Sequence, residues 1–204
     1  MNNSYVPLLL SLALLLGAQP AAAEKADRDK PMNIEADSLR YDDLKQISVF
    51  TGNVVVTKGT IVIRGARVEV HQDPEGYQYG VVTAAPGRLA FYRQKREGVD
   101  EFVEGESQVI EYDGKADRVK FIRQADLRRL RGSVLSDEMV GSLITYDNSN
   151  DVFTVDGGPG SPAPGGRVRA VLAPRPSASA PASPATAAPA AQLRPSMTLD
   201  GSRK

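Results

Sequence analysis

Residues 54–63 read VVVTKGTIVI, two runs of β-branched residues joined through a turn at Gly59. β-Branched side chains favour extended strands, and a glycine between two such runs is typical of a tight hairpin turn. The stretch therefore predicts an antiparallel hairpin. Residues 66–71 then read ARVEVH, in which apolar and polar residues alternate. A period of two places one strand face against an apolar interior and the other in water.

A six-residue unit recurs four times along the chain. Each copy begins with a small residue and carries bulky apolar groups at its fourth and sixth positions, and three copies are followed by turn residues. The copies are ADSLRY at 36–41, GARVEV at 65–70, SQVIEY at 107–112 and GSLITY at 141–146. No long stretch keeps a helical period. Repetition of one strand–turn–strand unit predicts an all-β fold built as stacked hairpins, a jelly roll or a solenoid-like pair of sheets.

Both ends of the chain differ in composition from the part between them. Residues 8–16 are an apolar run interrupted only by Ser11, and AAA at 21–23 ahead of Glu24 is an A-x-A cleavage site. The run is too short for a bilayer, so it predicts a secretory signal peptide over residues 1–23 and export to the periplasm. We expect a leader at 24–30, the folded domain at 31–174, and a disordered Ala/Pro/Ser-rich tail at 175–204 that buries too little apolar surface to fold.

The composition excludes most catalytic classes. The 204 residues include 25 Lys+Arg, 25 Asp+Glu, one His and no Cys. A chain without cysteine has no thiolate chemistry, and one histidine cannot build a multi-histidine metal centre. Zero net charge disfavours a nucleic-acid partner, whose phosphates need a cationic surface. No phosphate-binding loop, dinucleotide-binding motif or zinc-protease motif occurs, so we expect no metal and no cofactor.

Three groups of charged residues leave alternatives open. The acidic pairs 42–43 and 104/106 have the residue types of glycosidase chemistry, although acids in turns or beside a glycine are ordinarily solvated. The arginines at 123, 128, 129 and 131 either hold phosphates or charge an outer sheet face. His71 lies on the polar side of its strand, where an exposed histidine is the simpler interpretation than a general base.

Several short motifs resemble the OstA-like family of lipopolysaccharide-transport proteins. They are PMNIEADS at 31–38, FTGNV at 50–54, GTI at 59–61, AFY at 90–92, VEG at 103–105, ITY at 144–146 and VLAP at 171–174, with Tyr112 and Gly141. The resemblance covers Met32 to Pro174. The chain departs from the family at residues 123–125, where RQA replaces a Gly-x-Ala turn, and in extra residues between Leu127 and Met139.

The resemblance implies a twisted β-jellyroll of antiparallel strands, open at both ends, that holds the lipid A acyl chains of lipopolysaccharide in an apolar groove. It also implies head-to-tail self-association, bridging an LptC-like inner-membrane component and an LptD-like outer-membrane translocon. The family match gives the lining residues Met32, Ile34, Ala36, Phe91 and Tyr112. Strand alternation adds Leu39, Phe50, Ile61, Ile63, Val68, Val70, Ile110, Ile144 and Tyr146.

The sequence therefore favours a lipid carrier that is not an enzyme. One alternative is an extracytoplasmic carbohydrate-active β-solenoid enzyme that uses its Asp/Glu pairs. Activity on soluble polysaccharide that disappears on removal of Asp42 or Glu104 would favour this enzyme. A second alternative is a structural β module, which would carry no lipid when purified.

Overall fold

The computed structural model describes residue 27 and residues 30–174, and these form an all-β protein with one turn of 3-10 helix at Pro164–Gly166. The twelve strands are β1 (Met32–Glu35), β2 (Ser38–Asp42), β3 (Ile47–Lys58), β4 (Ile61–Gln72), β5 (Gln78–Thr83), β6 (Ala90–Lys95), β7 (Glu101–Ser107), β8 (Val109–Asp113), β9 (Arg118–Arg131), β10 (Val134–Asp147), β11 (Val152–Asp156) and β12 (Arg169–Leu172). The strand pairs are antiparallel, and the expected hairpin at 54–63 is the β3–β4 hairpin. The predicted antiparallel all-β fold is confirmed. The described residues contain no helix with the length and apolarity of a membrane span.

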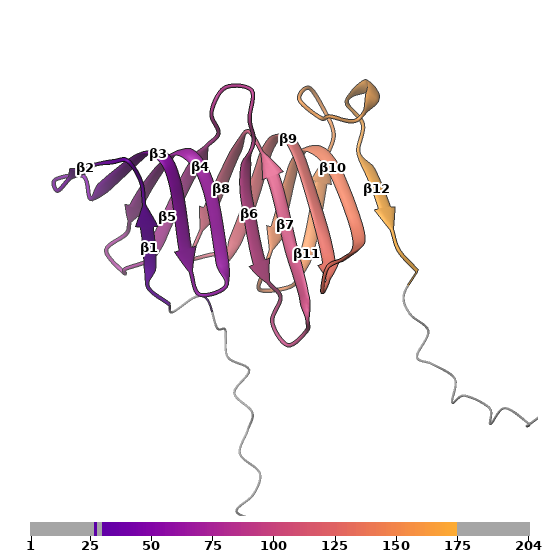
Figure 1. Ribbon diagram of the computed structural model, residues 1–204, viewed down its shortest axis with the longest axis horizontal. Coiled ribbons are helices and arrows are strands. Elements are labelled where there is room, and N and C mark those ends of the chain that lie inside the picture. Colours follow the sequence, from indigo (N-terminus) through magenta and orange to yellow (C-terminus); the bar gives the residue numbers. More distant parts are fainter. Residues whose placement is uncertain (1–26, 28–29, 175–204) are drawn as a thin grey trace, which may run out of the picture. The chain divides into compact units, whose positions relative to one another are not determined.

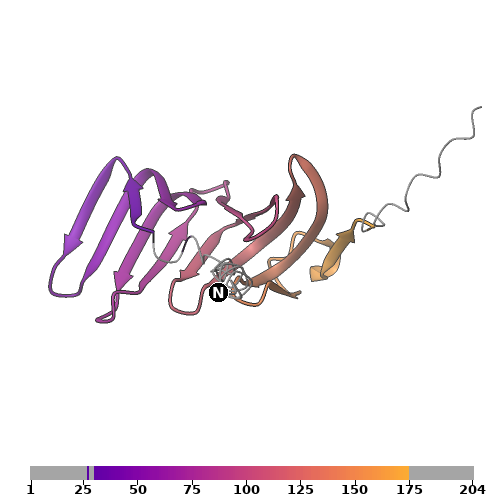
Figure 2. The same ribbon diagram turned by 90° about the horizontal axis from the view of Figure 1, so that it is seen from below.

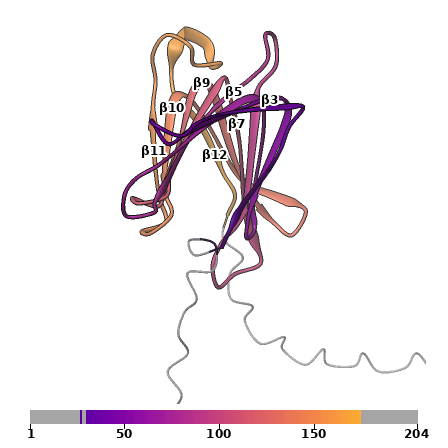
Figure 3. The ribbon, with the colours of Figure 1, turned by 90° about the vertical axis from the view of Figure 1, so that its left-hand side faces the viewer.

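Four long strands bend midway, and each contributes to two walls. β3, for example, pairs with β2 through its first half and with β1 through its second half. Wall 1 has the strand order β1-β3-β4-β6-β7-β9-β10-β12. Wall 2 has the order β2-β3-β4-β5-β8-β9-β10-β11. Figure 3 looks along the long axis, with β11 of wall 2 and β7 of wall 1 on opposite sides.

The chain passes between the walls on one side of the molecule, which we call the spine. The crossings are residues 36–37, 52–53, 65–66, 84–89, 107–108, 123–124, 141–142 and 157–168. The hairpin turns lie on the opposite side, which we call the rim; in Figure 1 the spine is at the top and the rim below. Figure 2, seen from the rim side, shows the strands following one another from the β1–β2 end to the β12 end. The two walls and the spine thus enclose a trough that runs lengthwise.

Two of the four bends use left-handed backbone. In β3 the bend falls at Gly52 and Asn53, with φ of 83° and 45°, and in β9 at Arg123 and Gln124, with φ of 61° and 51°. Two successive non-glycine residues in this region cost on the order of 1 kcal/mol each. The N–H of Gln124 donates to the carbonyl of Gly160 at 2.6 Å, which ties the strained bend to the 157–168 crossing. This hydrogen bond stabilises a bend that is formed by two non-glycine residues.

The inner faces of the walls carry three apolar ladders, because residues opposite one another on antiparallel strands share a face. In wall 2 the ladders are Leu39–Phe50–Val68–Val82–Ile110–Phe121–Ile144–Val155 and Tyr41–Ser48–Val70–Gly80–Tyr112–Val119–Tyr146–Phe153. In wall 1 the ladder is Ile34–Val56–Ile63–Tyr92–Gly105–Leu127–Met139–Ala170. Apolar side chains thus line the trough from its first edge strand to its last.

The middle of the trough is filled by side chains that meet from the two walls. Tyr92 of wall 1 and Phe121 of wall 2 are both 0% exposed, and their rings make an edge contact with centroids 5.6 Å apart. Gly105 makes room for this contact, because a Cβ there would lie 2.2 Å from Cε1 of Phe121. The walls are therefore in direct contact at this point, which we call the central contact.

Gly105→Ala is expected to lower the free energy of unfolding by about 1–3 kcal/mol, since the added methyl overlaps the ring of Phe121 in a packed core. Thermal or denaturant unfolding measures the loss. The double variant Gly105→Ala with Phe121→Leu should recover part of it, because leucine withdraws the overlapping ring atoms. A Gly105→Ala protein as stable as the original would show that the walls are not in contact there.

Candidate functional site

Twelve of the fourteen expected lining residues lie on inner wall faces. Seven of these are buried in the core: Ile61, Ile63, Val68, Ile110, Tyr112, Ile144 and Tyr146. Met32, Ile34, Phe50 and Val70 are partly buried and pack against that core. Leu39 is 59% exposed, because it ends its ladder on the edge strand β2. The structure thus brings most of the expected residues onto one continuous inner surface.

Two expected residues lie elsewhere. Ala36 is exposed in the crossing between β1 and β2. Phe91 faces outward from wall 1, with its ring 5.4 Å from the guanidinium carbon of Arg64, and its neighbour Tyr92 faces the trough. The assignment of Phe91 to the lining is corrected for this reason. The charged residues Arg93 and Lys95 share the parity of Phe91, and this signal in the sequence already indicated an outward face.

The sequence reasoning also missed several inner residues. Besides Tyr92, the buried ladder members that it did not name are Val56, Val82, Val119, Phe121 and Leu127. All of them follow an inward parity that strand alternation could have supplied, and in β9 this parity is the same before and after the bend at Arg123 and Gln124.

The trough is hollow at its β1–β2 end. A cavity of about 200 Å³ lies there between β1 of wall 1 and the first strands of wall 2, and Figure 1 places these strands at one end of the molecule. Its apolar lining is Met32, Ile34, Phe50 and Val70, and Tyr41 lies at its edge with several polar residues. We call this cavity the mouth. It is the place where four of the expected residues meet around open space.

A network of charges joins the walls across the rim. Nε of Arg96, beside the β6–β7 turn of wall 1, donates to Oδ1 of Asp151 in the β10–β11 turn of wall 2 at 3.1 Å, and a second guanidinium nitrogen pairs with Oδ2. Arg96 also pairs with Glu101, which accepts a 2.9 Å bond from Arg131. We call these four residues the rim clasp. The hydroxyl of Tyr146 lies beside it, 3.4 Å from Asp151, and burial raises the pKa of Tyr146 to about 12, so this phenol stays protonated.

The rim clasp gives the protein an acid-sensitive element. Burial opposes ionisation of Glu101, but the hydrogen bond from Arg131 and the charge of Arg96 outweigh it and hold the pKa of Glu101 below its usual value. A carboxylate with a lowered pKa stabilises the fold above its unfolded pKa, and the contribution is lost as the pH falls through the folded pKa.

Glu101→Gln is therefore expected to lower the free energy of unfolding by about 1–2 kcal/mol at pH 7, and by progressively less below pH 4.5. Denaturant titrations at pH 7 and pH 3.5 measure the difference. Glu97→Gln, an exposed substitution in the same turn, is the control and should be neutral at both pH values. An equal loss at both pH values would contradict this account of the clasp.

Asp27, placed by the sequence in the leader, contacts the domain at the rim. Its carboxylate accepts hydrogen bonds from the backbone N–H and the hydroxyl of Thr60, at 2.6 and 2.5 Å, and from Nε2 of Gln94 at 3.1 Å. Gln94 in turn accepts the hydroxyl proton of Tyr92 at 2.5 Å. This chain of bonds leads from the rim to the central contact. The signal peptide and tail expected at 1–23 and 175–204 lie outside the described residues.

The expected acidic pairs have local structural partners. Asp42 accepts the backbone N–H of Lys45 in a turn, and Asp43 accepts the hydroxyl of Tyr41. Glu104 pairs with Arg93, and Glu106 with Arg128, across neighbouring strands of wall 1. The described residues hold no cluster of three or more metal-ligating side chains. These acids have the geometry of sheet-stabilising ion pairs and turn caps.

The expected basic cluster is also spread over separate ion pairs. Besides Arg128, Arg129 pairs with Asp137, and Arg131 with Glu101. Arg123 lies in the β9 bend beside Gly160. The cluster therefore does not form one phosphate-binding surface.

Comparisons with known proteins place this geometry in a family. Residues 33–152 match the family described as LptA/(LptD N-terminal domain) LPS transport protein. The lipopolysaccharide export system protein LptH of Pseudomonas aeruginosa is 31% identical over 172 residues, which cover 83% of this chain and 94% of LptH. The lipopolysaccharide export system protein LptA of Escherichia coli K12 is 33% identical over 139 residues, covering 68% of this chain and 74% of LptA.

A solved structure shows the same fold. The crystal structure of LptH, described as the LptA homologous periplasmic component of the lipopolysaccharide transport device of Pseudomonas aeruginosa, superposes with a TM-score of 0.61 at 27% identity. The superposition covers 72% of this chain and 99% of that one.

Proposed function

The chain belongs to the family of LptA/(LptD N-terminal domain) lipopolysaccharide transport proteins, and we propose that it carries lipopolysaccharide across the periplasm with the lipid A acyl chains held between its two walls. Proteins of this family transport and do not catalyse a reaction. The observation that carries the proposal is the set of three apolar ladders, which run from one edge of the sheet to the other and open at the mouth.

The physical need for such a trough follows from solvation. Each CH₂ taken out of water gains about 0.8 kcal/mol, so a single acyl chain of ordinary length represents on the order of 10 kcal/mol. An apolar surface that is continuous along the molecule removes this penalty at every position of the cargo. Similar side chains at successive steps of a ladder also avoid one deep energy minimum that would trap the lipid.

Transport through the middle of the trough requires the walls to separate. The central contact between Tyr92 and Phe121 occupies the space that acyl chains need, and the rim clasp holds the walls together on the open side. We expect the walls to swing apart about the spine when lipid enters at the mouth. Lipid contacts then replace the contacts between the walls, so the apolar side chains stay out of water in both states.

The two ends of the trough are suited to stacking. β1 and β2 form the edges at one end and β11 and β12 those at the other, and large apolar side chains are exposed on them, among them Leu39, Tyr41 and Leu172. Pairing of the β11–β12 end of one copy with the β1–β2 end of the next would continue the ladders. Such a head-to-tail contact does not close on itself and can extend. The same edges would receive an LptC-like inner-membrane component and an LptD-like outer-membrane translocon.

Stacking can be separated from lipid binding at Val171. This residue is half exposed on β12 and opposite Glu138, so it faces outward. Val171→Asp is expected to weaken self-association at least tenfold while lipid binding is unchanged, as measured by light scattering over a concentration series. Val81→Asp, at an exposed outward valine within wall 2, is the matched control. Equal association of the three proteins would contradict the proposed contact.

Mass spectrometry of lipid extracted from the purified protein tests the carrier proposal. Protein produced in a lipopolysaccharide-containing host should yield lipid A species, and protein stripped of lipid should bind purified lipopolysaccharide saturably. A folded protein that carries no lipid A and shows no saturable binding would refute the proposal.

A further inference from the structure

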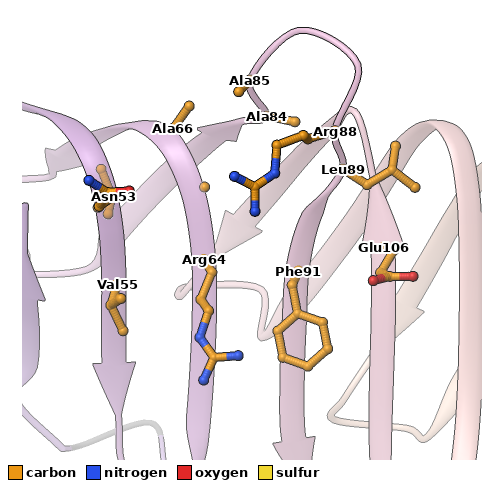
Figure 4. A pocket seen from close by; sticks show the side chains of 12 residues that line it. Asn53, Val55, Arg64, Ala66, Ala84, Ala85, Arg88, Leu89, Phe91 and Glu106 are labelled. Atoms are coloured by element: carbon orange, nitrogen blue, oxygen red, sulfur yellow. The ribbon is translucent and has the colours of Figure 1, made fainter.

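A second cavity, of about 520 Å³, lies on the outer side of wall 1 at the spine. It forms where β4 changes partners: residues 62–64 pair with β6, residues 67–72 pair with β5, and the 84–89 crossing spans the gap. Alanine, valine and leucine side chains make its apolar surface, and Arg64, Arg88, Phe91 and Glu106 supply the remaining large groups. Figure 4 shows both guanidinium groups over the gap between β4 and β6, with that of Arg64 beside the ring of Phe91.

Both arginines are presented by ordered backbone. Arg64 lies within β4 and stacks over Phe91 at 5.4 Å. Arg88 is the last residue of a tight turn in which its N–H donates to the carbonyl of Ala85 at 3.0 Å. Pro86 and Gly87 fill the central positions, and the φ of 72° at Gly87 is the value that a type II turn requires there. The two exposed arginines therefore reach the same cavity from separate elements, a strand and a turn.

The two arginines differ from most other arginines of the described residues, which are paired with acids. Examples are Arg67 with Glu69, Arg93 with Glu104 and Arg129 with Asp137. Neither arginine of the cavity forms an ion pair with any described residue. The one carboxylate of the cavity belongs to Glu106. It accepts a 2.7 Å hydrogen bond from Arg128, whose positive charge neutralises it. The cavity thus carries two positive charges without counter-charges.

We propose that this cavity is a binding site for a phosphate dianion, either free or as the monoester of a sugar. A phosphate dianion matches two guanidinium forks in charge and in the number of hydrogen-bond acceptors, whereas one carboxylate would leave a guanidinium unmatched. The apolar floor suits the non-polar face of a sugar that carries the phosphate. The volume lies within the range of ordinary small-molecule sites. The site faces away from the trough, so it goes beyond the transport proposal and does not depend on it.

Calorimetric or NMR titrations of the whole protein with three probes test the site: N-acetylglucosamine 1-phosphate, inorganic phosphate and N-acetylglucosamine. The two phosphates are expected to bind saturably and to shift the amide resonances of Ala84, Ala85, Gly87 and Arg88, and the neutral sugar is not. Tighter binding of the sugar phosphate than of inorganic phosphate would identify a phosphorylated saccharide as the source. Equal binding would identify free phosphate.

Arg64→Gln and Arg88→Gln should each weaken phosphate binding about tenfold, because each removes a charge-assisted contact. Arg40→Gln, which removes an exposed arginine of β2 outside the cavity, should leave binding unchanged. Lipopolysaccharide binding measured in parallel should be the same in all these variants. Absence of saturable phosphate binding, or binding that survives the double substitution of Arg64 and Arg88, would overturn the proposal.

Discussion

Covalent closure of the rim clasp is expected to abolish lipopolysaccharide binding. Cysteines introduced by Arg96→Cys and Asp151→Cys can be joined by a short bis-maleimide with a cleavable disulfide spacer. The chain has no other cysteine, so only this pair reacts. Because Arg96 belongs to wall 1 and Asp151 to wall 2, the link prevents the walls from separating around acyl chains. We expect at least a hundredfold loss of affinity in the linked protein and recovery after reduction.

A link within a single wall controls for the chemistry. Arg67→Cys with Glu69→Cys places the same reagent on one face of β4, where a link constrains no movement between the walls. This protein should bind lipopolysaccharide equally well before and after linking. Normal binding by the linked Arg96/Asp151 variant would show that lipid enters without opening of the rim, and the proposed separation of the walls would be wrong.

The second large effect is expected at the mouth. Ile34→Asp places a carboxylate among Met32, Phe50 and Val70, where acyl chains would have to bury it. An ionised carboxylate without a partner is strongly disfavoured in an apolar site, so we expect lipopolysaccharide affinity to fall by about a hundredfold or more. The sheet should still form, since Ile34 is only partly buried on the edge strand β1.

The neighbouring position supplies the control. Asn33 is exposed on the opposite face of β1, so Asn33→Asp adds the same charge outside the trough. Surface plasmon resonance with immobilised lipopolysaccharide, together with circular dichroism of each variant, separates lost binding from lost folding. Equal affinities of the Ile34→Asp and Asn33→Asp proteins, both folded, would exclude the mouth as the entry point.

Strand alternation predicted the inner surface well, because it depends only on neighbouring residues. It identified Phe50, Val68, Ile110 and Ile144 as members of one face, and the strand register places all four on a single ladder. The prediction that Phe91 lines the trough was wrong. The sequence contained the reason, since the charged residue Arg93 lies on the same face of the strand. Phe91 was assigned inward from the family motif, whereas the charges on its strand face indicate an outward position.

Other features depend on contacts between residues far apart in the chain. The rim clasp joins Arg96 to Asp151 over 55 positions, and nothing near either residue indicates the other. The central contact exists because Gly105 leaves space for Phe121, and the sequence shows a glycine in a strand without showing what fills its place. To predict the cavity of Arg64 and Arg88 one would likewise need to know where along β4 the pairing partner changes from β6 to β5.

Site-specific photocrosslinking at adjacent positions of one strand tests most directly whether the lipid lies between the walls. Benzoylphenylalanine is placed at Phe50 or Val49 near the mouth, and at Tyr146 or Thr145 on the other side of the central contact; Phe50 and Tyr146 belong to inner ladders, and their neighbours face outward. After illumination with lipopolysaccharide, we predict adducts at Phe50 and Tyr146 and none at Val49 or Thr145. Adducts of equal yield at inner and outer positions, or at the outer positions alone, would contradict the account.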